Sequence, residues 1–250
     1  LCCDFLLRRL SLYVEVEQRY TFEERYAMLL RYHDASWINL WCATSAYYHA
    51  LCGKIDKIPE VFLKHRLSDV NILAPGKPMM EMIENQVYLA EGAYAKVVGR
   101  STQLLAVCET MHYVLVALHI QIQTAAAYEK LGKLEEARIW LKKALSDAEP
   151  DNLVMPFVEN YDFLKPVLAL EIRTDFIAQI IKLGEAAKRR RGENVRPAVF
   201  VTLTKREYEL ACLKVQRLSN REIAEKLFLS EGSVKQYVNQ LYSKLHIEGD

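Results

Sequence analysis

The sequence lacks the usual means of crossing a membrane, cradling a nucleotide phosphate or holding zinc. No run of eighteen apolar residues occurs in its 250 residues, which argues against a transmembrane helix. The nine glycines include no pair with the spacing of a Gly-x-x-x-x-Gly-Lys loop, and this excludes that ATP-binding loop. The six cysteines form no Cys-x-x-Cys pair, so we expect reduced thiols rather than zinc or redox sites.

The amino-terminal residues carry no export signal. Residues 1–9 lack the charged start, long apolar stretch and small-residue cleavage site of a signal peptide. With 51% hydrophobic and 26% charged residues, the chain has the composition of a folded protein. We therefore expect a cytoplasmic protein with no membrane partner. Because it starts at Leu1 within an apparent amphipathic helix, we also expect it to be a piece of a longer protein.

The net charge of +1 hides an asymmetry between the two ends of the chain. Residues 182–250 carry 14 Lys and Arg against 9 Asp and Glu, whereas residues 1–181 have an acidic excess. The basic excess centres on Lys182, the run 188–191 and Arg196. Such a cluster attracts polyanions, although a solvated basic linker without a partner explains the run equally well.

The region before residue 187 has apolar residues at three- and four-residue spacings and no strand-like alternation, which predicts an all-α fold. The expected helix breaks are Gly53, Pro59, residues 75–78, Gly99, Gly132, Pro150, Pro156 and Pro166. Gly184, Gly192 and Pro197 interrupt the pattern further and suggest a linker. We predict three parts: a helical repeat domain for sensing or interaction over 1–183, a basic linker over 184–202 and a second domain over 203–250.

One stretch resembles a tetratricopeptide repeat. Its small residues would let two antiparallel helices approach closely, and its larger ones would fill the space between them. The matching positions are Ala125, Tyr128, Gly132, Leu134, Ala137, Leu141, Ala144 and Pro150. Gly92 and Gly99 stand 33 residues before Ala125 and Gly132, but few other positions repeat. We therefore expect a degenerate tetratricopeptide-like array in which further helix pairs stack on this unit.

Near the carboxyl terminus, three Ser or Thr residues precede helix-like segments. Thr204 with Glu207 and Ser219 with Glu222 have the spacing of a capping box, and Ser230 precedes the third segment without a glutamate. The predicted helices cover 205–216, 220–227 and 231–245. A short second helix, a brief turn and a longer third helix form a helix-turn-helix.

The third predicted helix has two faces of opposite character. An apolar face, which should contact the other two helices, carries Val234, Val238, Leu241 and Leu245. The opposite face carries Lys235, Gln236, Asn239 and Ser243. Lysine can donate to guanine, and glutamine and asparagine can pair with adenine. We expect this face to read base edges in double-stranded DNA, although any solvated helix face is polar.

Three segments resemble the DNA-binding domain of LuxR-type transcription regulators. They are Leu-Thr-Lys-Arg-Glu at 203–207, Leu-Ser-Asn-Arg-Glu-Ile-Ala at 218–224 and Leu-Ser-Glu-Gly-Ser-Val-Lys at 229–235. The resemblance implies a bacterial, sequence-specific DNA-binding transcription regulator. A sigma-factor region 4 domain is the nearest alternative, but the Ser219-Asn220 pair and the long helical region favour the LuxR type.

The resemblance also implies roles for particular residues. Lys235, Gln236 and Asn239 occupy the family's base-reading positions, and the DNA-backbone contacts fall on Ser233, Tyr237, Ser243 and Lys244. Tyr237 stands where the family usually has histidine. The family's fourth helix, which often forms the dimer contact, would follow residues 244–247, and the sequence stops at Asp250. The sequence therefore leaves open whether the protein is a homo-oligomer.

A LuxR-type domain behind a degenerate helical array is similar to the large ATP-dependent LuxR regulators, a family typified by the maltose-regulon activator. That family's nucleotide-binding domain would lie upstream of Leu1 or be missing, so we expect no cofactor in this chain. The resemblance implies that the helical region senses a small-molecule inducer or a protein partner. It assigns no ligand residues.

Other features of the helical region have two interpretations. Seven aromatic residues could line a ligand or peptide surface or pack between helices: Trp37, Trp41, Tyr47, Tyr48, Tyr94, Tyr113 and Tyr128. The spacing of Cys108, His112 and His119 favours core packing over metal ligation, so we expect no metal site. We find no catalytic constellation of nucleophile, base and orienting group. An interaction scaffold tethered by its last domain, and an enzyme fragment, remain alternatives to a regulator.

Overall fold

The fold comes from a computed structural model that describes residues 2–12, 16, 20–67, 70, 74–192, 205–215 and 218–244. These residues form helices and turns without any strand, which confirms the predicted all-α class. The chain divides into two compact units, Leu1–Gly192 and Glu193–Asp250. Each unit has its own hydrophobic core and is described separately.

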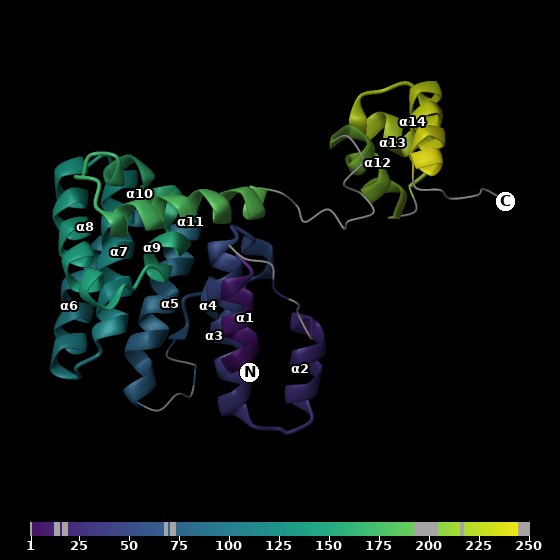
Figure 1. Cartoon of the computed structure of the whole chain (residues 1–250). Helices are drawn as coiled ribbons and strands as arrows, with labels where there is room; N and C mark the ends of the chain where they lie inside the picture. Colours follow the sequence, from purple (N-terminus) through teal and green to yellow (C-terminus); the bar gives the residue numbers. More distant parts are fainter. Residues whose placement is uncertain are drawn as a thin grey trace. The chain divides into compact units, whose positions relative to one another are not determined.

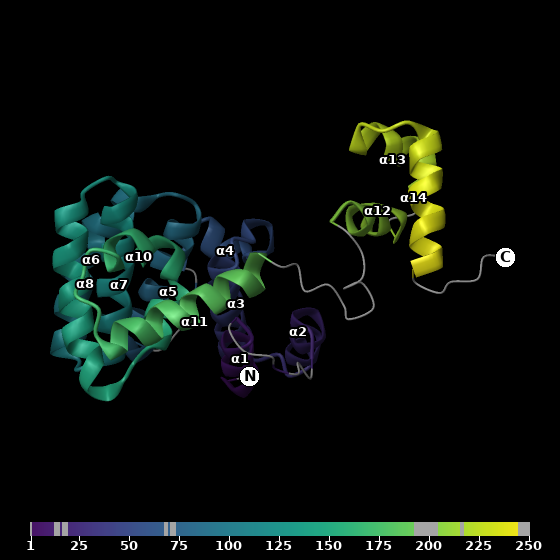
Figure 2. The ribbon, with the colours of Figure 1, turned by 45° about the horizontal axis from the view of Figure 1, so that its top comes forward.

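The first unit contains eleven of the α-helices in the described residues, shown in Figure 1. Their bounds are α1 Cys2–Leu10, α2 Phe22–Leu30, α3 Ala35–Leu51, α4 Glu60–Leu63, α5 Lys77–Ala90, α6 Tyr94–Thr110, α7 Val114–Lys130, α8 Leu134–Ala148, α9 Met155–Glu159, α10 Tyr161–Leu168 and α11 Asp175–Gly192. Helices α5 to α8 form a row in which each helix packs on the next. Figure 2 shows α11 crosswise to this row, where it packs on α9 and α10.

Three tight turns with the same backbone conformation join the helices of the row. Gly92, His112 and Gly132 take positive φ angles of 78°, 55° and 72°. The following residue donates its backbone N–H to a carbonyl in the last turn of the helix, as Lys133 does to Tyr128 at 3.0 Å. This left-handed ending satisfies carbonyls that a helix end leaves unpaired. It confirms that Gly132 ends a helix, and connections this short make neighbouring helices antiparallel.

Two of the expected helix breaks are corrected by the structure. Gly99 lies within α6, and Pro166 lies within α10, where it removes one backbone N–H from a short helix. Gly92, rather than Gly99, takes the position in its turn that Gly132 takes in the next hairpin. The predicted 33-residue correspondence therefore does not describe these helices, because α6 and α7 are long and their turns short. Whether the row is a tetratricopeptide array stays a prediction.

The α7–α8 hairpin packs as its small residues predict. Ala125, Ala137 and Ala144 are fully buried where the two helices meet, and so is Leu141. Tyr128 is half-buried against the same core. Small side chains at these positions let the helix axes approach closely enough for leucine to fill the remaining space.

A chain of buried amides crosses the core of the first unit. Gln123 of α7 donates to Gln86 of α5 at 3.0 Å, and Gln86 donates to Asn160 before α10 at 3.0 Å. Gln123 also donates to the backbone carbonyl of Met82 at 3.0 Å. These side chains are almost completely buried, so the hydrogen bonds offset the cost of removing the amides from water.

The last helix of the first unit extends into the segment predicted to be a linker. α11 continues through Gly184 and the whole basic run 188–191 to Gly192, so residues 184–192 are helical. At Gly184 the helix lies against the ring of buried Tyr161, where a Cβ atom would come within 2.2 Å of the ring. Glycine is there for close packing and not to break the helix. The remainder of the predicted linker, 193–202, lies outside the described residues.

The second unit contains α12 Lys205–Val215, α13 Asn220–Leu227 and α14 Glu231–Lys244. They match the three predicted helices, whose expected last residues 216 and 245 fall outside the described part. The core joins all three helices through Leu210, Ile223, Val234, Val238 and Leu241. Apolar residues three and four apart thus face inward on each helix.

Candidate nucleic-acid interface

The start of α13 is fixed by the predicted capping box. The Ser219 backbone N–H donates to Oε2 of Glu222 at 2.7 Å, and the Glu222 N–H donates to Oγ of Ser219 at 3.3 Å. The hydrogen bonds from Ser219 lower the pKa of Glu222. The cap thereby sets where α13 begins. The other predicted box starts at Thr204, which lies outside the described residues.

A tight turn reverses the chain between α13 and α14. Phe228 has a φ of 53°, and the next backbone N–H, that of Leu229, donates to the carbonyl of Ala224 at 2.9 Å. The side chain of Phe228 is 95% exposed. From α12, the guanidinium of Arg206 donates to the carbonyl of Leu227 at the end of α13. These contacts hold the angle at which α14 leaves the turn.

Ser230 caps α14, as predicted, and the helix itself begins at the next residue, Glu231. The Oγ of Ser230 accepts the backbone N–H of Ser233 at 3.1 Å, which satisfies one of the free N–H groups in the first turn. The two serine hydroxyls also lie 2.8 Å apart. Ser233 is therefore part of the helix cap, and its predicted contact with a DNA phosphate would have to share its hydroxyl with Ser230.

The two faces of α14 differ as the sequence predicts. Val234, Val238 and Leu241 are between 0% and 8% exposed against the core. Lys235, Gln236 and Asn239 are exposed on the other side, where their side chains contact no part of the core. Tyr237 lies between the faces, half-buried against the core cluster. An exposed helix face that offers an ammonium and two amides has the donors and acceptors needed to pair with base edges.

The structure gives Lys244 an intramolecular partner. Its Nζ lies 2.8 Å from one carboxylate oxygen of Glu207 and 2.9 Å from the other. The Glu207 side chain is 4% exposed and the Lys244 side chain 40% exposed. A phosphate contact by Lys244 would have to compete with this ion pair. The side chain of Ser243, the other residue predicted near it, lies outside the described part.

Sequence reasoning missed this ion pair because it assigned Glu207 to a helix cap. A signal was nevertheless present: Glu207 lies three and four residues before Leu210 and Ala211, which are both buried. On a helix these positions share one face. A carboxylate on a buried face needs a cation or several donors, and this requirement could have directed the search to a basic residue near the end of α14.

Short α13, the tight turn and two-faced α14, packed on α12, make up a helix-turn-helix domain. The domain belongs to the family described as bacterial regulatory proteins, luxR family, whose model matches residues 201–250.

Two curated proteins with similar sequences are named transcriptional regulatory proteins. The transcriptional regulatory protein LnrK of Bacillus subtilis (strain 168) is 36% identical over 75 residues, which are 29% of this chain and 34% of LnrK. The transcriptional regulatory protein LiaR of the same strain is 41% identical over 59 residues, 24% of this chain and 27% of LiaR. The chain thus spans about a third or less of these relatives. No solved structure matches it.

The first unit contains a buried polar cluster that sequence reasoning did not identify. Glu159 of α9 binds the guanidinium of Arg9 from α1 and accepts the hydroxyl of Tyr47 from α3 at 2.7 Å. Nδ1 of His119 lies 3.3 Å from the same hydroxyl. Burial lowers the pKa of His119 to about 4, so it is neutral at pH 7. Since every member has a partner in the cluster, we assign it a structural role.

Within the described residues, no three His, Cys, Asp or Glu side chains come together as metal ligands would. Cys108 and His119 are buried, whereas His112 lies in an exposed turn. The helices of that same part of the chain include none long and apolar enough to cross a membrane. Of the predicted aromatic residues, Tyr47 is buried in the core and Trp37 is 48% exposed. Trp41 lines a cavity between α2 and α3.

Proposed function

We propose that the protein is a DNA-binding transcription regulator whose second unit reads a promoter sequence. The observation that carries the proposal is the exposed face of α14, where Lys235, Gln236 and Asn239 lie opposite a fully packed apolar face. Membership of the domain in the luxR family and the names of LnrK and LiaR support it. A regulator of this kind works on the chromosome, and hence in the cytoplasm.

We further propose that the first unit senses a small molecule or a protein partner. A row of antiparallel helices presents extended surfaces and intervening cavities to such a partner. Several cavities of a few hundred Å³ lie between its helices, and this is the size range of small-molecule sites. Sensing would then bias how the second unit engages DNA.

Replacement of Gln236 by Ala tests the base-reading role. A preferred duplex is first selected from random sequences with the 250-residue chain, and affinities are then measured by fluorescence anisotropy. We expect Gln236→Ala to weaken the preferred duplex by about 1 to 3 kcal/mol, or roughly 5- to 150-fold, because a bidentate pair is lost. Binding to random DNA, which rests on phosphate contacts, should change less than about twofold.

The matched control is Gln103→Ala, which removes an exposed glutamine from α6 in the first unit. It should leave both affinities unchanged. Equal weakening of the preferred and random duplexes by Gln236→Ala would contradict the base-reading role. Failure of the wild-type chain to bind any duplex at low salt would overturn the DNA-binding function as a whole.

A further inference from the structure

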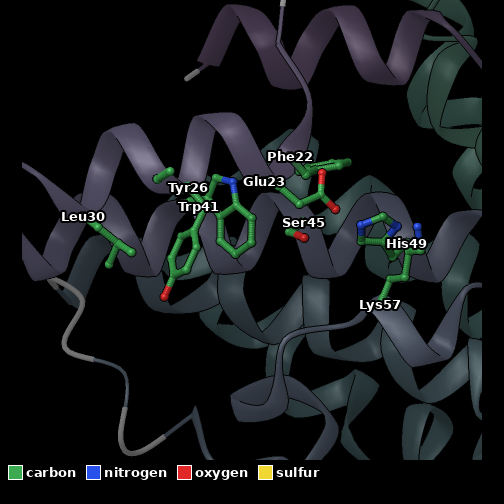
Figure 3. A pocket seen from close by; sticks show the side chains of 9 residues that line it. Phe22, Glu23, Tyr26, Leu30, Trp41, Ser45, His49 and Lys57 are labelled. Atoms are coloured by element: carbon green, nitrogen blue, oxygen red, sulfur yellow. The ribbon is translucent and has the colours of Figure 1, made fainter.

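A cavity of about 310 Å³ lies between α2 and α3, at a place to which no function has been assigned. Besides Glu23, Ala27 and Lys57, its walls come from Phe22, Tyr26 and Leu30 of α2 and from Trp41, Ser45 and His49 of α3. These residues are spaced four apart on each helix, so each helix contributes one continuous face. We call this cavity the α2–α3 slot. Figure 3 shows Leu30 near one end and His49 with Lys57 near the other.

Aromatic rings that contact one another line the middle of the slot. The rings of Tyr26 and Trp41 stack with their centroids 4.4 Å apart, and Phe22 meets Trp41 edge to face at 6.2 Å. In contrast, α2 buries none of its residues completely, and Leu30 is 43% exposed. The apolar face of α2 is therefore only partly covered by α3, and an apolar ligand in the slot would bury more of it.

Two polar atoms along the slot are buried without a hydrogen-bond partner. They are Nδ1 of His49 and the indole Nε1 of Trp41. The whole His49 residue is only 7% exposed. An unpaired buried polar atom is costly, and most such atoms in folded proteins find a partner. Nδ1 of His49 has almost no exposed surface, so a ligand in the slot would pair with it only after the imidazole turned.

The polar end of the slot is electropositive. Burial, followed by the positive charges of Lys54 and Lys57, lowers the pKa of His49 to about 4. Arg8 acts on His49 in the same direction, and Glu23, which lines the slot, opposes them. Within the described residues, no carboxylate lies within ion-pair distance of Lys54 or Lys57. Three cations and one anion around a neutral imidazole favour an anionic group on the ligand.

We propose that the α2–α3 slot binds a small aromatic carboxylate. The ring of the ligand would lie against Tyr26 and Trp41, and its carboxylate would face Lys57 at the His49 end of the slot. Size, aromatic lining and charge each point to this class: the cavity holds a one- or two-ring molecule, and Lys57 lines it at the His49 end, where Lys54 and Arg8 add positive charge.

The α2–α3 slot would determine which class of ligand the first unit binds. An effect of that binding on DNA recognition rests on the proposed function. A ligand between α2 and α3 would add contacts to α2, none of whose residues is fully buried. It would stabilise the first unit by mass action. Binding itself is a separate property, which can be measured without DNA.

The test titrates the 250-residue chain by calorimetry with two matched pairs of probes. The carboxylates are phenylacetate and indole-3-acetate, and the uncharged counterparts are phenylacetamide and indole-3-acetamide. We expect saturable binding of at least one carboxylate, at least tenfold tighter than its amide. Absence of binding by both carboxylates up to about 10 mM, or equal binding of acids and amides, would overturn the proposal, because about 0.3 kcal/mol per non-hydrogen atom already gives ligands of this size a Kd of roughly 1 to 10 mM.

Variants then locate the site. Ala27 is an exposed residue of α2 that lines the slot. In Ala27→Trp the indole ring would fill the slot, so we expect both acids and amides to bind at least tenfold more weakly. Lys57→Met should weaken the carboxylates at least tenfold and leave the amides within twofold. The matched control Lys142→Met removes an exposed lysine of α8 and should change neither.

Three further results separate the alternatives. Carboxylate binding that survives Ala27→Trp, with an unchanged melting temperature, places the ligand elsewhere and overturns the proposal. Binding that is lost equally in Lys57→Met and Lys142→Met reflects general charge attraction and also overturns it. If the slot binds its probe but duplex affinity is unchanged by the probe, the site stands and the proposed sensing role fails. DNA binding without any probe is tested independently by Gln236→Ala.

Discussion

Nζ of Lys244, in the last turn of α14, lies 2.8 Å from a carboxylate oxygen of Glu207, in the first turn of α12. The Glu207 side chain is almost entirely removed from water. The pair therefore connects the carboxyl-terminal end of α14 to α12, against which α14 packs. This ion pair holds the carboxyl-terminal end of α14, while the turn at Phe228 holds its amino-terminal end.

Lys244→Met should destabilise the second unit by about 1 to 3 kcal/mol. The substitution removes the ammonium partner of a buried carboxylate, although water can replace part of it because Lys244 is partly exposed. Hydrogen exchange of the α14 backbone, read by mass spectrometry, measures the loss. Lys226→Met, which changes an exposed lysine of α13 in the same unit, is the matched control and should have little effect. Unchanged exchange in Lys244→Met would show that the ion pair contributes nothing.

Phe228→Gly should stabilise the turn before α14 by up to about 1 kcal/mol. Phe228 holds a left-handed φ of 53°, which glycine adopts without steric cost, and its ring is 95% exposed, so little burial is lost. Phe228→Ala keeps the Cβ atom and the strain, and should show no such gain. Slower exchange of the Leu229 and Val234 amides would measure the effect. A gain that is equal in the alanine variant would contradict the explanation by backbone strain.

Gly184→Ala and Gly99→Ala should have opposite effects. A Cβ at Gly184 would come within 2.2 Å of the buried Tyr161 ring, whereas nothing lies within 4 Å of a Cβ at Gly99. We expect Gly184→Ala to cost about 3 kcal/mol, because neither the helix nor the ring can move freely. Gly99→Ala should add about 0.5 to 1 kcal/mol, because alanine is the better helix former. Urea unfolding followed by tryptophan fluorescence reports on this unit, and equal effects would contradict the packing argument.

The stability of the first unit should depend on His119 as the pH falls. Burial lowers the folded-state pKa of His119 from 6.5 to about 4, so the unfolded chain binds the proton more readily. The contribution of the neutral imidazole is complete above pH 6.5 and is lost as the pH falls towards 4. The free energy of unfolding should therefore decline less steeply over this window in His119→Gln than in the wild type.

The control for this pH dependence is His33→Asn, a change in an exposed turn where asparagine also accepts a positive φ. Its unfolding free energy should follow the wild-type pH dependence. The expected difference between wild type and His119→Gln, taken from pH 7 to pH 4, is on the order of 3 kcal/mol. Parallel curves for the two proteins would mean that His119 is not held neutral by burial.

The second unit was largely predictable from the sequence because its signals are local. The Ser219 box, the Ser230 cap and the spacing of Val234, Val238 and Leu241 all act within one or two helical turns. The base-reading roles stay predictions, since exposure of Lys235, Gln236 and Asn239 is a condition for such roles and no proof of them.

The features that could not be predicted depend on partners distant in the sequence. Gly184 lies within α11 and does not end a helix. The residue is a glycine because the Tyr161 ring leaves no space for a side chain beside it. Glu207 binds Lys244 across 37 residues, which no helical period reveals. Trp41 lines a slot instead of the core because α2 covers it only in part, and the extent of such coverage follows from the packing of whole helices.

The buried amides of Gln86, Gln123 and Asn160 have a consequence for how the first unit can move. Alanine and leucine surfaces alone would still fit reasonably well if α7 slid past α5 by one turn, about 5 Å. The amides would then lose their partners in an environment without water, at a cost of about 1 to 3 kcal/mol for each group left unpaired. Any response of this unit to a ligand is therefore expected where α2 packs on α3 or where α11 packs on α9 and α10, and not by sliding within the row.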